Sequence, residues 1–311
     1  MEINTLGEFL QFYRIKYGFR QEKVCSGICS IATLSRIENG SKEVDSLVAE
    51  SLLGRLGKEV LQFEIILNDY DYELWSSRQE IQKMIADGSY QKAKDKIIKY
   101  RDKMPKGESV HEQYCLCQEA KVRFCEEAQK EELRQIWWTA LRLTKPELEK
   151  DVAEDLLYNP TETELIINLL HADFPQWREK DKKKELEKLF RYVEKIYSGT
   201  QKERLGSQIL IELIEIEQSS GNYMAVINYV DKAVSFISRG RGIDHVAELH
   251  FTKAKMLELL YHDKNEWKEQ EQVCKEESMM AYYVFDIMEQ IEEKEQVQQF
   301  CKDKLKWHII E

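Results

Sequence analysis

The stretch SIATLSRIENG, residues 30–40, decides the fold of the N-terminal region. It begins with Ser30, a residue type that often caps the first turn of a helix, and it ends with Gly40, which often stops one. Leu34 and Ile37 between them are spaced as on one face of a helix. The stretch therefore predicts a short helix with one buried face and one polar, cationic outer face.

Two further short helices are predicted before this stretch. Thr5 and Glu8 form a capping-box pattern, so a helix begins there and continues to about residue 17, where Gly18 stops it. A second helix covers about 20–26, and a tight turn of Gly, Ile and Cys separates it from Ser30. The two helices on either side of this turn predict a helix–turn–helix over 20–39.

The region 5–57 resembles the helix–turn–helix domain of the lambda-repressor type. The resemblance is carried by Arg14, Gly18, Gln21-Glu22, Gly27-Ile28-Cys29-Ser30 and Leu34-Ser35-Arg36-Ile37-Glu38-Asn39-Gly40. The Gly-Ile-Cys-Ser turn is similar to one branch in particular, the RNPP (Rgg/PlcR-like) peptide-sensing regulators of low-GC Gram-positive bacteria. The alternative is a plain helical hairpin inside a larger bundle.

Such a domain places the first residues of its third helix against base edges in the major groove. Arg36 can pair with guanine, and Ala32 or Thr33 can contact a thymine methyl group. Side chains and N–H groups at helix starts, and a lysine just beyond the helix, can hold phosphates. The predicted DNA-binding residues are Gln21, Ser30, Ile31, Ala32, Thr33, Arg36 and Lys42.

Composition favours an all-helical protein, because 4 prolines and 13 glycines are few for 311 residues. The net charge of −11 is uneven: residues 1–58 carry 8 basic and 7 acidic side chains, which leaves 38 basic and 50 acidic in the remainder. We expect only the near-neutral N-terminal part to bind nucleic acid.

The remaining composition predicts a cytoplasmic protein without membrane segments. The seven cysteines are an odd number and lack metal-ligand spacing, so we expect reduced, buried thiols and no metal site. No secretory signal or long apolar run is recognised. No P-loop, nucleophile elbow or paired-carboxylate pattern stands out, and we expect neither a cofactor nor enzymatic activity.

Beyond residue 75 the chain alternates between helix and short turn. The turns Asp87-Gly88-Ser89-Tyr90 and Ser220-Gly221-Asn222-Tyr223 are alike and lie 133 positions apart, close to four tetratricopeptide units. A cap at Thr161 is predicted for one of the helices between them. Because a single helix pair cannot bury its apolar face, the pairs must stack. We predict a right-handed superhelix of degenerate tetratricopeptide-like pairs, behind a five-helix helix–turn–helix domain.

The predicted domains are 1–57 for DNA binding, 58–75 as a connecting helix, and 76–311 for peptide binding and dimerisation. Stacked pairs leave a concave groove, which suits an extended peptide. Amide and charged side chains on the first helix of each pair line such a groove and can bond a peptide backbone. The predicted peptide-binding residues are Asn168, Gln208, Glu212, Glu215 and Lys255.

The resemblance implies a homodimer that binds a two-part operator in double-stranded DNA under the control of a short signalling peptide. Two alternatives remain open. The repeats could be a scaffold for a partner protein, with DNA binding secondary, or the protein could be a repressor that needs no ligand.

Overall fold

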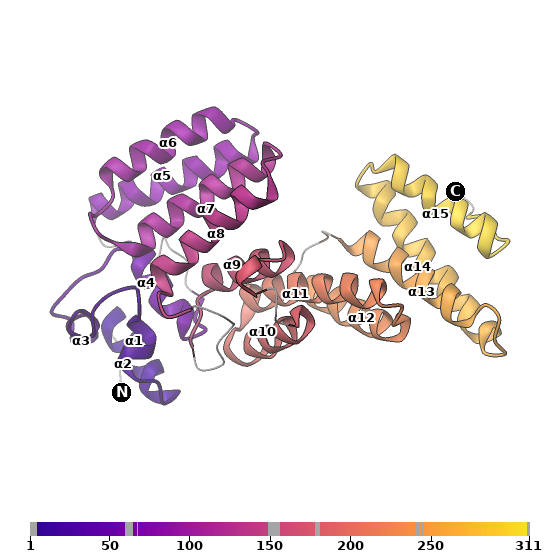
Figure 1. Ribbon diagram of the computed structural model, residues 1–311, viewed down its shortest axis with the longest axis horizontal. Helices are drawn as coiled ribbons and strands as arrows, with labels where there is room; N and C mark the ends of the chain where they lie inside the picture. The colour runs from indigo at the N-terminus through magenta and orange to yellow at the C-terminus, as the bar shows by residue number, and fades with distance from the viewer. Residues whose placement is uncertain are drawn as a thin grey trace. The chain divides into compact units, whose positions relative to one another are not determined.

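The computed structural model describes residues 5–59, 65–66, 68–148, 156–177, 181–240, 243 and 245–309. Within these ranges the regular structure is helical, with fifteen α-helices, the short 3₁₀ helix Pro175–Trp177 and no strand. The prediction of an all-α fold is confirmed. The helices form two compact units, Met1–Ser198 and Gly199–Glu311, which are treated separately below (Figure 1).

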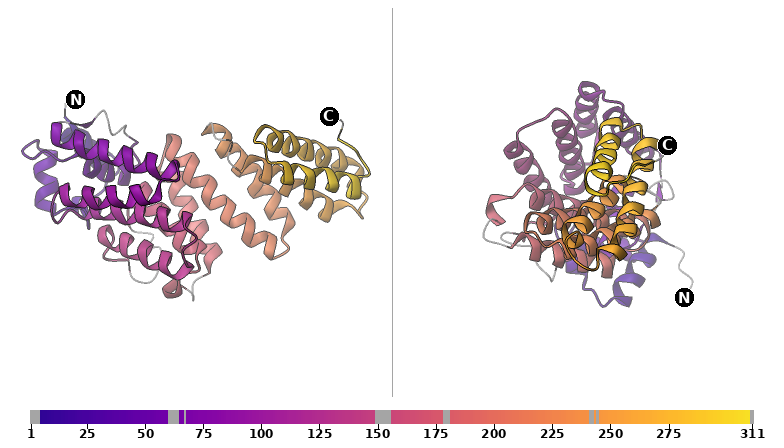
Figure 2. Two further views of the ribbon diagram at one scale, coloured as in Figure 1. Left: turned by 90° about the horizontal axis from the view of Figure 1, so that it is seen from above. Right: turned by 90° about the vertical axis from the view of Figure 1, so that its right-hand side faces the viewer.

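Within each unit, consecutive helices pack against one another. In the first unit α5 packs on α6, α6 on α7 and α7 on α8. In the second unit each helix packs on the next, as α14 does on α15 in Figure 2. The first unit contains α1 (Leu6–Lys16), α2 (Gln21–Cys25), α3 (Ile31–Glu38), α4 (Ser46–Arg55), α5 (Asp69–Ala86), α6 (Tyr90–Lys103), α7 (Ser109–Cys125), α8 (Lys130–Thr144), α9 (Pro160–His171) and α10 (Lys182–Ile196). The second unit contains α11 (Gly199–Ser219), α12 (Tyr223–Arg239), α13 (Val246–Tyr261), α14 (Trp267–Ile287) and α15 (Ile291–Lys304).

The first and third helices begin and end where the sequence predicts. Thr5 caps α1 in a capping box with Glu8, and Gly18 follows with a φ of 71°. Ser30 caps α3 by accepting a hydrogen bond from a backbone N–H in the first turn, and Gly40 follows with a φ of 73°. A left-handed backbone of this kind favours glycine, because other side chains meet a steric penalty there.

The N-terminal helices share their core with helices further along the chain. The core cluster joins α1–α4 to Val110 of α7 and to Leu157, which precedes α9. Gly27, in the turn between α2 and α3, lies so close to α8 that a Cβ atom placed there would be 2.3 Å from the carbonyl oxygen of Thr144. The helix–turn–helix therefore packs directly on the helices that follow it.

Two features of the predicted N-terminal organisation differ from the structure. The described residues 5–59 contain four α-helices, α1–α4, and not five. The described part of 58–75 is not one continuous helix, since Lys58, Glu59 and Ile66 lie outside helices and α5 begins at Asp69, capped by Asn68. The remaining residues of the predicted connecting helix before Asn68, 60–64 and 67, lie outside the described residues.

The two similar turns have the same structure. Gly88 and Gly221 both have a φ of 71°, and each turn leads into a helix that begins at a tyrosine, Tyr90 in α6 and Tyr223 in α12. This agreement supports the prediction that the turns mark equivalent places in repeated helix pairs.

The predicted helix cap at Thr161 is wrong by two residues. Asn159 caps α9 and forms a capping box with Glu162, while Pro160 occupies the first helical position. Proline suits this position because its fixed φ is helical and its missing N–H would have no partner in the helix. The capping box places Glu162 in the buried first turn of α9, where its carboxylate also pairs with Arg55.

Candidate DNA-reading surface and peptide groove

The third helix presents two different faces. Leu34 and Ile37 are buried in the core of the helix–turn–helix, whereas Ile31 is 49% exposed. Ala32 and Arg36 are also exposed, and Thr33 is half-buried. In the part of the chain that the structure describes, the Arg36 side chain forms no hydrogen bond or ion pair. The face that the sequence assigns to base contact is thus open to a ligand.

The side chains of Ser30 and Thr33 form hydrogen bonds within the first turn of α3. Ser30 Oγ accepts a hydrogen bond from the Thr33 backbone N–H at 3.1 Å and donates to Thr33 Oγ1 at 3.0 Å. The cap satisfies one of the free N–H groups at the start of α3. A phosphate contact by Ser30 would have to share this oxygen with the cap.

Gln21 is held at the start of α2 by a buried carboxylate. Its Nε2 donates to Glu38 Oε2 at 2.8 Å, and the Arg14 guanidinium donates to both Glu38 oxygens at 2.6 and 2.7 Å. The hydrogen bond to Glu38 raises the pKa of Arg14. Glu38 therefore joins α1, α2 and α3, and Gln21 keeps only one amide N–H for a phosphate.

Lys42 lies just beyond the third helix, as predicted. The backbone N–H groups of Ser41 and Lys42 both donate to the carbonyl oxygen of Arg36, at 2.9 and 3.1 Å. These bonds fix the chain at the end of α3, with the exposed Lys42 side chain beside its last turn. The predicted residues of α3 and Lys42 therefore lie on one short, fixed segment of the chain.

The fourth helix contains an arginine that sequence reasoning missed. Arg55 and Glu162 are both 0% exposed and are joined by two hydrogen bonds of 2.5 and 3.2 Å. Arg55 also donates to the carbonyl oxygens of Val24, Ser26 and Thr144, at 2.9, 2.6 and 2.9 Å. We call these residues the Arg55 cluster. It connects α2, the turn before α3, α4, α8 and α9.

Lys145 completes the Arg55 cluster. Its Nζ lies 4.0 Å from Glu162 and 3.9 Å from Glu147, too far for a hydrogen bond, although the side chain is fully buried. Burial lowers the pKa of Lys145 to about 8. Burial would raise the pKa of Glu162, but the charges of Arg55 and Lys145 outweigh it and lower that pKa.

The other end of α4 is held by a second buried network. Asp71 accepts hydrogen bonds from Ser46 N and Oγ at 3.0 and 2.8 Å, and Arg78 donates to Ser46 Oγ at 2.9 Å and to the Tyr100 hydroxyl at 3.2 Å. His111 follows, 2.6 Å from the Tyr100 hydroxyl.

We call Ser46, Asp71, Arg78, Tyr100 and His111 the Arg78 cluster. His111 Nε2 also lies 3.2 Å from the Asp45 carboxylate, which caps α4. The cluster connects the start of α4 to α5, α6 and α7. A sequence signal for it existed in the charged positions Asp71 and Arg78 on the apolar face of α5, but the pattern does not identify their partners.

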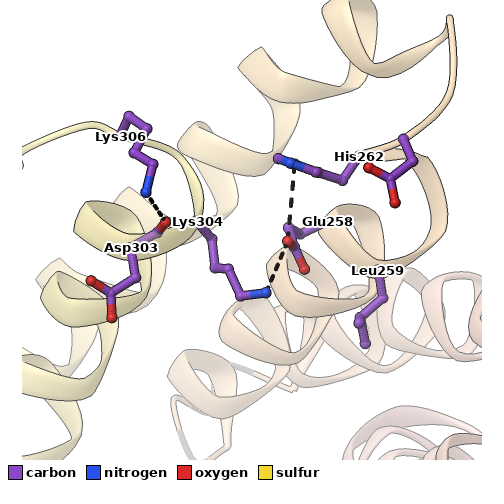
Figure 3. Close-up of a pocket in the computed structure, with 7 residues that line it drawn as sticks. Glu258, Leu259, His262, Asp303, Lys304 and Lys306 are labelled. Carbon is purple, nitrogen blue, oxygen red and sulfur yellow. Dashed lines mark hydrogen bonds and ion pairs between the residues drawn. The ribbon is translucent and has the colours of Figure 1, made fainter.

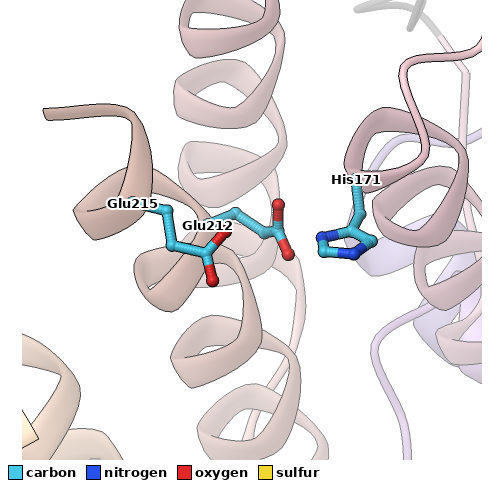
Figure 4. A group of neighbouring side chains, drawn as sticks. All are labelled: His171, Glu212 and Glu215. Carbon is cyan, nitrogen blue, oxygen red and sulfur yellow. The ribbon is translucent and has the colours of Figure 1, made fainter. Parts of the chain in front are cut away.

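Three of the predicted peptide-binding residues lie along one helix of the second unit. Gln208, Glu212 and Glu215 follow one another on α11 at spacings of four and three residues, and Figure 4 shows the last two leaving adjacent turns. Gln208 Oε1 is buried and accepts no hydrogen bond from any described residue. Glu212 is buried and Glu215 is exposed.

The remaining two predicted peptide-binding residues lie on other helices. Lys255 is on α13, with its ammonium group 4.4 Å from the Phe251 ring centre, and burial lowers its pKa. Asn168 is a half-buried residue of α9 in the first unit. Within the second unit, α11 and α13 are the first helices of the pairs α11–α12 and α13–α14, as the repeat prediction requires.

A cavity of about 510 Å³ lies elsewhere in the second unit, near the ends of α13 and α15 (Figure 3). Glu258 lies 3.3 Å from Lys304 of α15 and 3.9 Å from His262, one turn along at the end of α13. The cavity contains charges of both signs and none of the predicted peptide-binding residues. Its lining residues are Glu258, Leu259, His262, Asp263, Asp303, Lys304 and Lys306.

Among the helices that the structure describes, none has the length and apolar content to cross a membrane. No protein-family model and no curated sequence matches the chain. Solved structures do match it. The apo form of PlcR from Bacillus thuringiensis aligns with a TM-score of 0.53 and 13% identity, over 94% of this chain and 97% of that chain.

The structure of PlcR in complex with the peptide PapR7 and DNA aligns with a TM-score of 0.52 and 14% identity, over 95% of this chain and 99% of that chain. The likeness covers both the helix–turn–helix and the repeat region of the present chain. At the level of fold, the resemblance inferred from the sequence is confirmed, and the chain has the all-helical fold of PlcR.

Proposed function

We propose that the protein is a dimeric transcription regulator whose affinity for a two-part DNA operator is controlled by a short peptide. The observation that carries the proposal is the open face of α3 on a fold shared with PlcR, which was solved in complex with a peptide and DNA. The proposed domain organisation is the predicted one: DNA binding by 1–57, with 58–75 connecting it to peptide binding and dimerisation by 76–311.

The proposed DNA contacts follow the geometry of α3. Ile31, Ala32, Thr33 and Arg36 face the major groove, and the Arg36 guanidinium, which lacks a described protein partner, is available for a guanine edge. Ser30 and the remaining N–H of Gln21 lie at helix starts, where phosphates are held. Lys42 adds one charge beside the end of the helix.

A dimer is part of the proposal because one copy offers little electrostatic attraction to DNA. Residues 1–58 carry a balance of +1, and DNA affinity depends on the number of phosphates that are neutralised. Two copies on one operator would double the phosphate contacts and require two correctly spaced half-sites. Any change in the spacing of the two helix–turn–helix domains would then change affinity.

The proposed peptide groove is lined by the first helices of the pairs. The buried, unsatisfied Oε1 of Gln208 supports this assignment, because a backbone N–H of a bound peptide would satisfy it. Asn168, Glu212, Glu215 and Lys255 are the other proposed contacts. The peptide would act by favouring one arrangement of the dimer over another.

The DNA-binding part is tested with the double variant T33A/R36A and the DNA that flanks the protein's own gene. We expect footprinting to show sequence-selective protection by the unaltered protein and its loss in the variant, at least tenfold in affinity. R142A is the matched control, because Arg142 is an exposed arginine on α8. Unchanged selectivity in T33A/R36A would contradict the assignment of α3.

The peptide-binding part is tested by adding short synthetic peptides encoded beside the gene to the protein–DNA complex. We expect one peptide to change DNA affinity in the unaltered protein and to do so less in Q208A. A scaffold protein would ignore peptides and retain a whole partner protein instead. A ligand-independent repressor would give full regulation with Gln208 and Glu212 both replaced.

A further inference from the structure

Two cysteines lie at the two ends of the turn between α2 and α3. Cys25 is the last residue of α2, and Cys29 directly precedes Ser30, the cap of α3. The backbone N–H of Cys29 donates to the carbonyl oxygen of Cys25 at 3.0 Å, which closes a single helix-like turn. One such turn separates the two Cα atoms by roughly 6 Å. Disulfides require Cα atoms at this separation.

The two thiols are in contact and differ in exposure. The neighbouring Cys29 side chain lowers the pKa of Cys25, and Cys25 together with burial raises the pKa of Cys29, while the Cys25 thiol donates a hydrogen bond to the carbonyl oxygen of Glu22 at 3.9 Å. Cys25 is 2% exposed, whereas Cys29 is half-buried and opens to solvent. The thiol with the lowered pKa is therefore the buried one, and the more exposed thiol lies beside it.

The Arg55 cluster surrounds the inner thiol. Arg55 donates to the carbonyl oxygens of Val24 and Ser26, the two residues that flank Cys25. Its fixed positive charge further lowers the pKa of the Cys25 thiol. Cys25 is the last residue of this five-residue helix and lies one turn from the half-buried Cys29.

We propose that Cys25 and Cys29 form a reversible disulfide when the protein meets hydrogen peroxide. The Cys25 sulfur attacks one peroxide oxygen, an S–O bond forms, the O–O bond breaks, and the leaving hydroxide takes a proton to become water. The Cys29 sulfur then attacks the Cys25 sulfenic acid, an S–S bond forms, and a second water leaves. The two thiols are oxidised and the peroxide is reduced; this inference does not depend on the proposed function.

The chain contains a matched control pair. Cys115 and Cys117 are even closer in sequence, two positions apart on α7, but side chains at that spacing point to different sides of the helix. Cys125 at the end of α7 is an exposed single thiol. Comparing the three sites separates the effect of the Cys25–Cys29 geometry from the effect of closeness in sequence and from the effect of exposure alone.

The test uses the full chain, treated with hydrogen peroxide, alkylated under denaturing conditions and digested with trypsin. Peptide 24–36 contains only Cys25 and Cys29, peptide 107–121 contains the control pair, and peptide 124–130 contains Cys125. We expect peptide 24–36 to become two hydrogen atoms lighter and unalkylated, and to take two alkyl groups again after dithiothreitol. We expect peptide 107–121 to remain doubly alkylated throughout.

Single variants sharpen the result. In C29S the Cys25 sulfenic acid has no partner, so we expect a sulfenic-acid reagent such as dimedone to label peptide 24–36. In C25S we expect Cys29 to stay alkylatable. The proposal is overturned if peptide 24–36 of the unaltered protein is still doubly alkylated at a peroxide dose that oxidises Cys125. This measurement uses only the unaltered protein and so does not depend on the folding of any variant.

Discussion

The third and fourth helices lie close together in sequence but are built for opposite tasks. Ile31, Ala32 and Arg36 on the outer face of α3 are exposed, and the Arg36 side chain forms no hydrogen bond or ion pair to the described chain. Nearly every residue of α4 is buried, and both of its ends enter ionic networks. One helix is free to meet a ligand, whereas the other is fixed to its surroundings.

This contrast indicates that α4 attaches the helix–turn–helix to the helices that follow it. The Arg78 cluster joins the start of α4 to α5–α7, and the Arg55 cluster joins its end to α2, α8 and α9. Removing one partner from a buried ion pair is far more costly than removing an exposed charge. The contrast therefore predicts a steep order of mutational effects.

We expect the largest effect for R55M. The substitution keeps side-chain volume but leaves Glu162 buried with Lys145, 4.0 Å away, as its one cationic neighbour among the described residues. The free energy of unfolding of the first unit should fall by about 3–5 kcal/mol, measured by urea denaturation. The double variant R55M/E162Q should recover part of the loss. A loss below about 1 kcal/mol would show that the Arg55 cluster does not hold α4.

A smaller loss is expected for D71A in the Arg78 cluster. Asp71 accepts two hydrogen bonds from Ser46 at the buried start of α4, and bonds to a charged acceptor contribute about 1.5–3 kcal/mol each in mutational series, not additively. We expect a loss of about 2–3 kcal/mol in the same denaturation experiment. D69A, which removes an exposed carboxylate from the same helix turn, is the control and should cost well under about 1 kcal/mol. Equal losses would remove the distinction between buried and exposed charges.

The opposite sign is expected for K145M. The pKa of Lys145 is lowered from 10.5 to about 8 by burial, so folding disfavours its charged form at neutral pH. Replacing a buried charge by an apolar side chain of similar length should raise stability at pH 7 by about 1–2 kcal/mol, since Arg55 still neutralises Glu162.

The pH dependence checks the cause of this effect. Between about pH 8 and 10.5 the unfolded Lys145 binds a proton that the folded one has lost, so rising pH favours the folded unaltered protein in this window. The advantage of K145M should therefore shrink as pH rises through it, as measured by urea denaturation at each pH. A pH-independent difference would point to packing rather than charge.

The smallest effect on stability is expected for R36A. Arg36 is exposed and its side chain has no described partner, so thermal and urea unfolding should change by less than about 0.5 kcal/mol. The same variant contributes to the loss of DNA selectivity proposed above. A marked loss of stability would mean that Arg36 belongs to the folded framework and not to a binding surface.

Local signals in the sequence predicted many helix ends correctly. Ser30 and Gly40 bound α3, and the turns at Gly88 and Gly221, predicted to be alike, both have a left-handed glycine. Caps and glycines act over three or four residues, so nearby sequence contains all the information they need. The exception at Thr161 arose because Asn159 and Pro160 offered a stronger start.

The exposed face of α3 was predictable from the sequence, but the side chains that support the helix were not. The sequence placed Arg36 on the outer face of α3, and it lies there. It did not reveal that Gln21 is bound by Glu38, nor that Arg55 bonds to a carboxylate 107 positions away. Partners at such distances along the chain follow from helix packing, which no local pattern encodes.

Local sequence patterns were sufficient to predict the all-helical fold, the boundaries of α3 and the division of that helix into an apolar and a polar face. These properties depend on backbone preferences and on a period of 3.6 residues. The burial of particular charges, the attachment of α4 at both ends and the position of Cys25 beside Arg55 depend on how the helices pack. Burial and electrostatic pairing are set by what packs against a residue, and those neighbours come from distant parts of the chain.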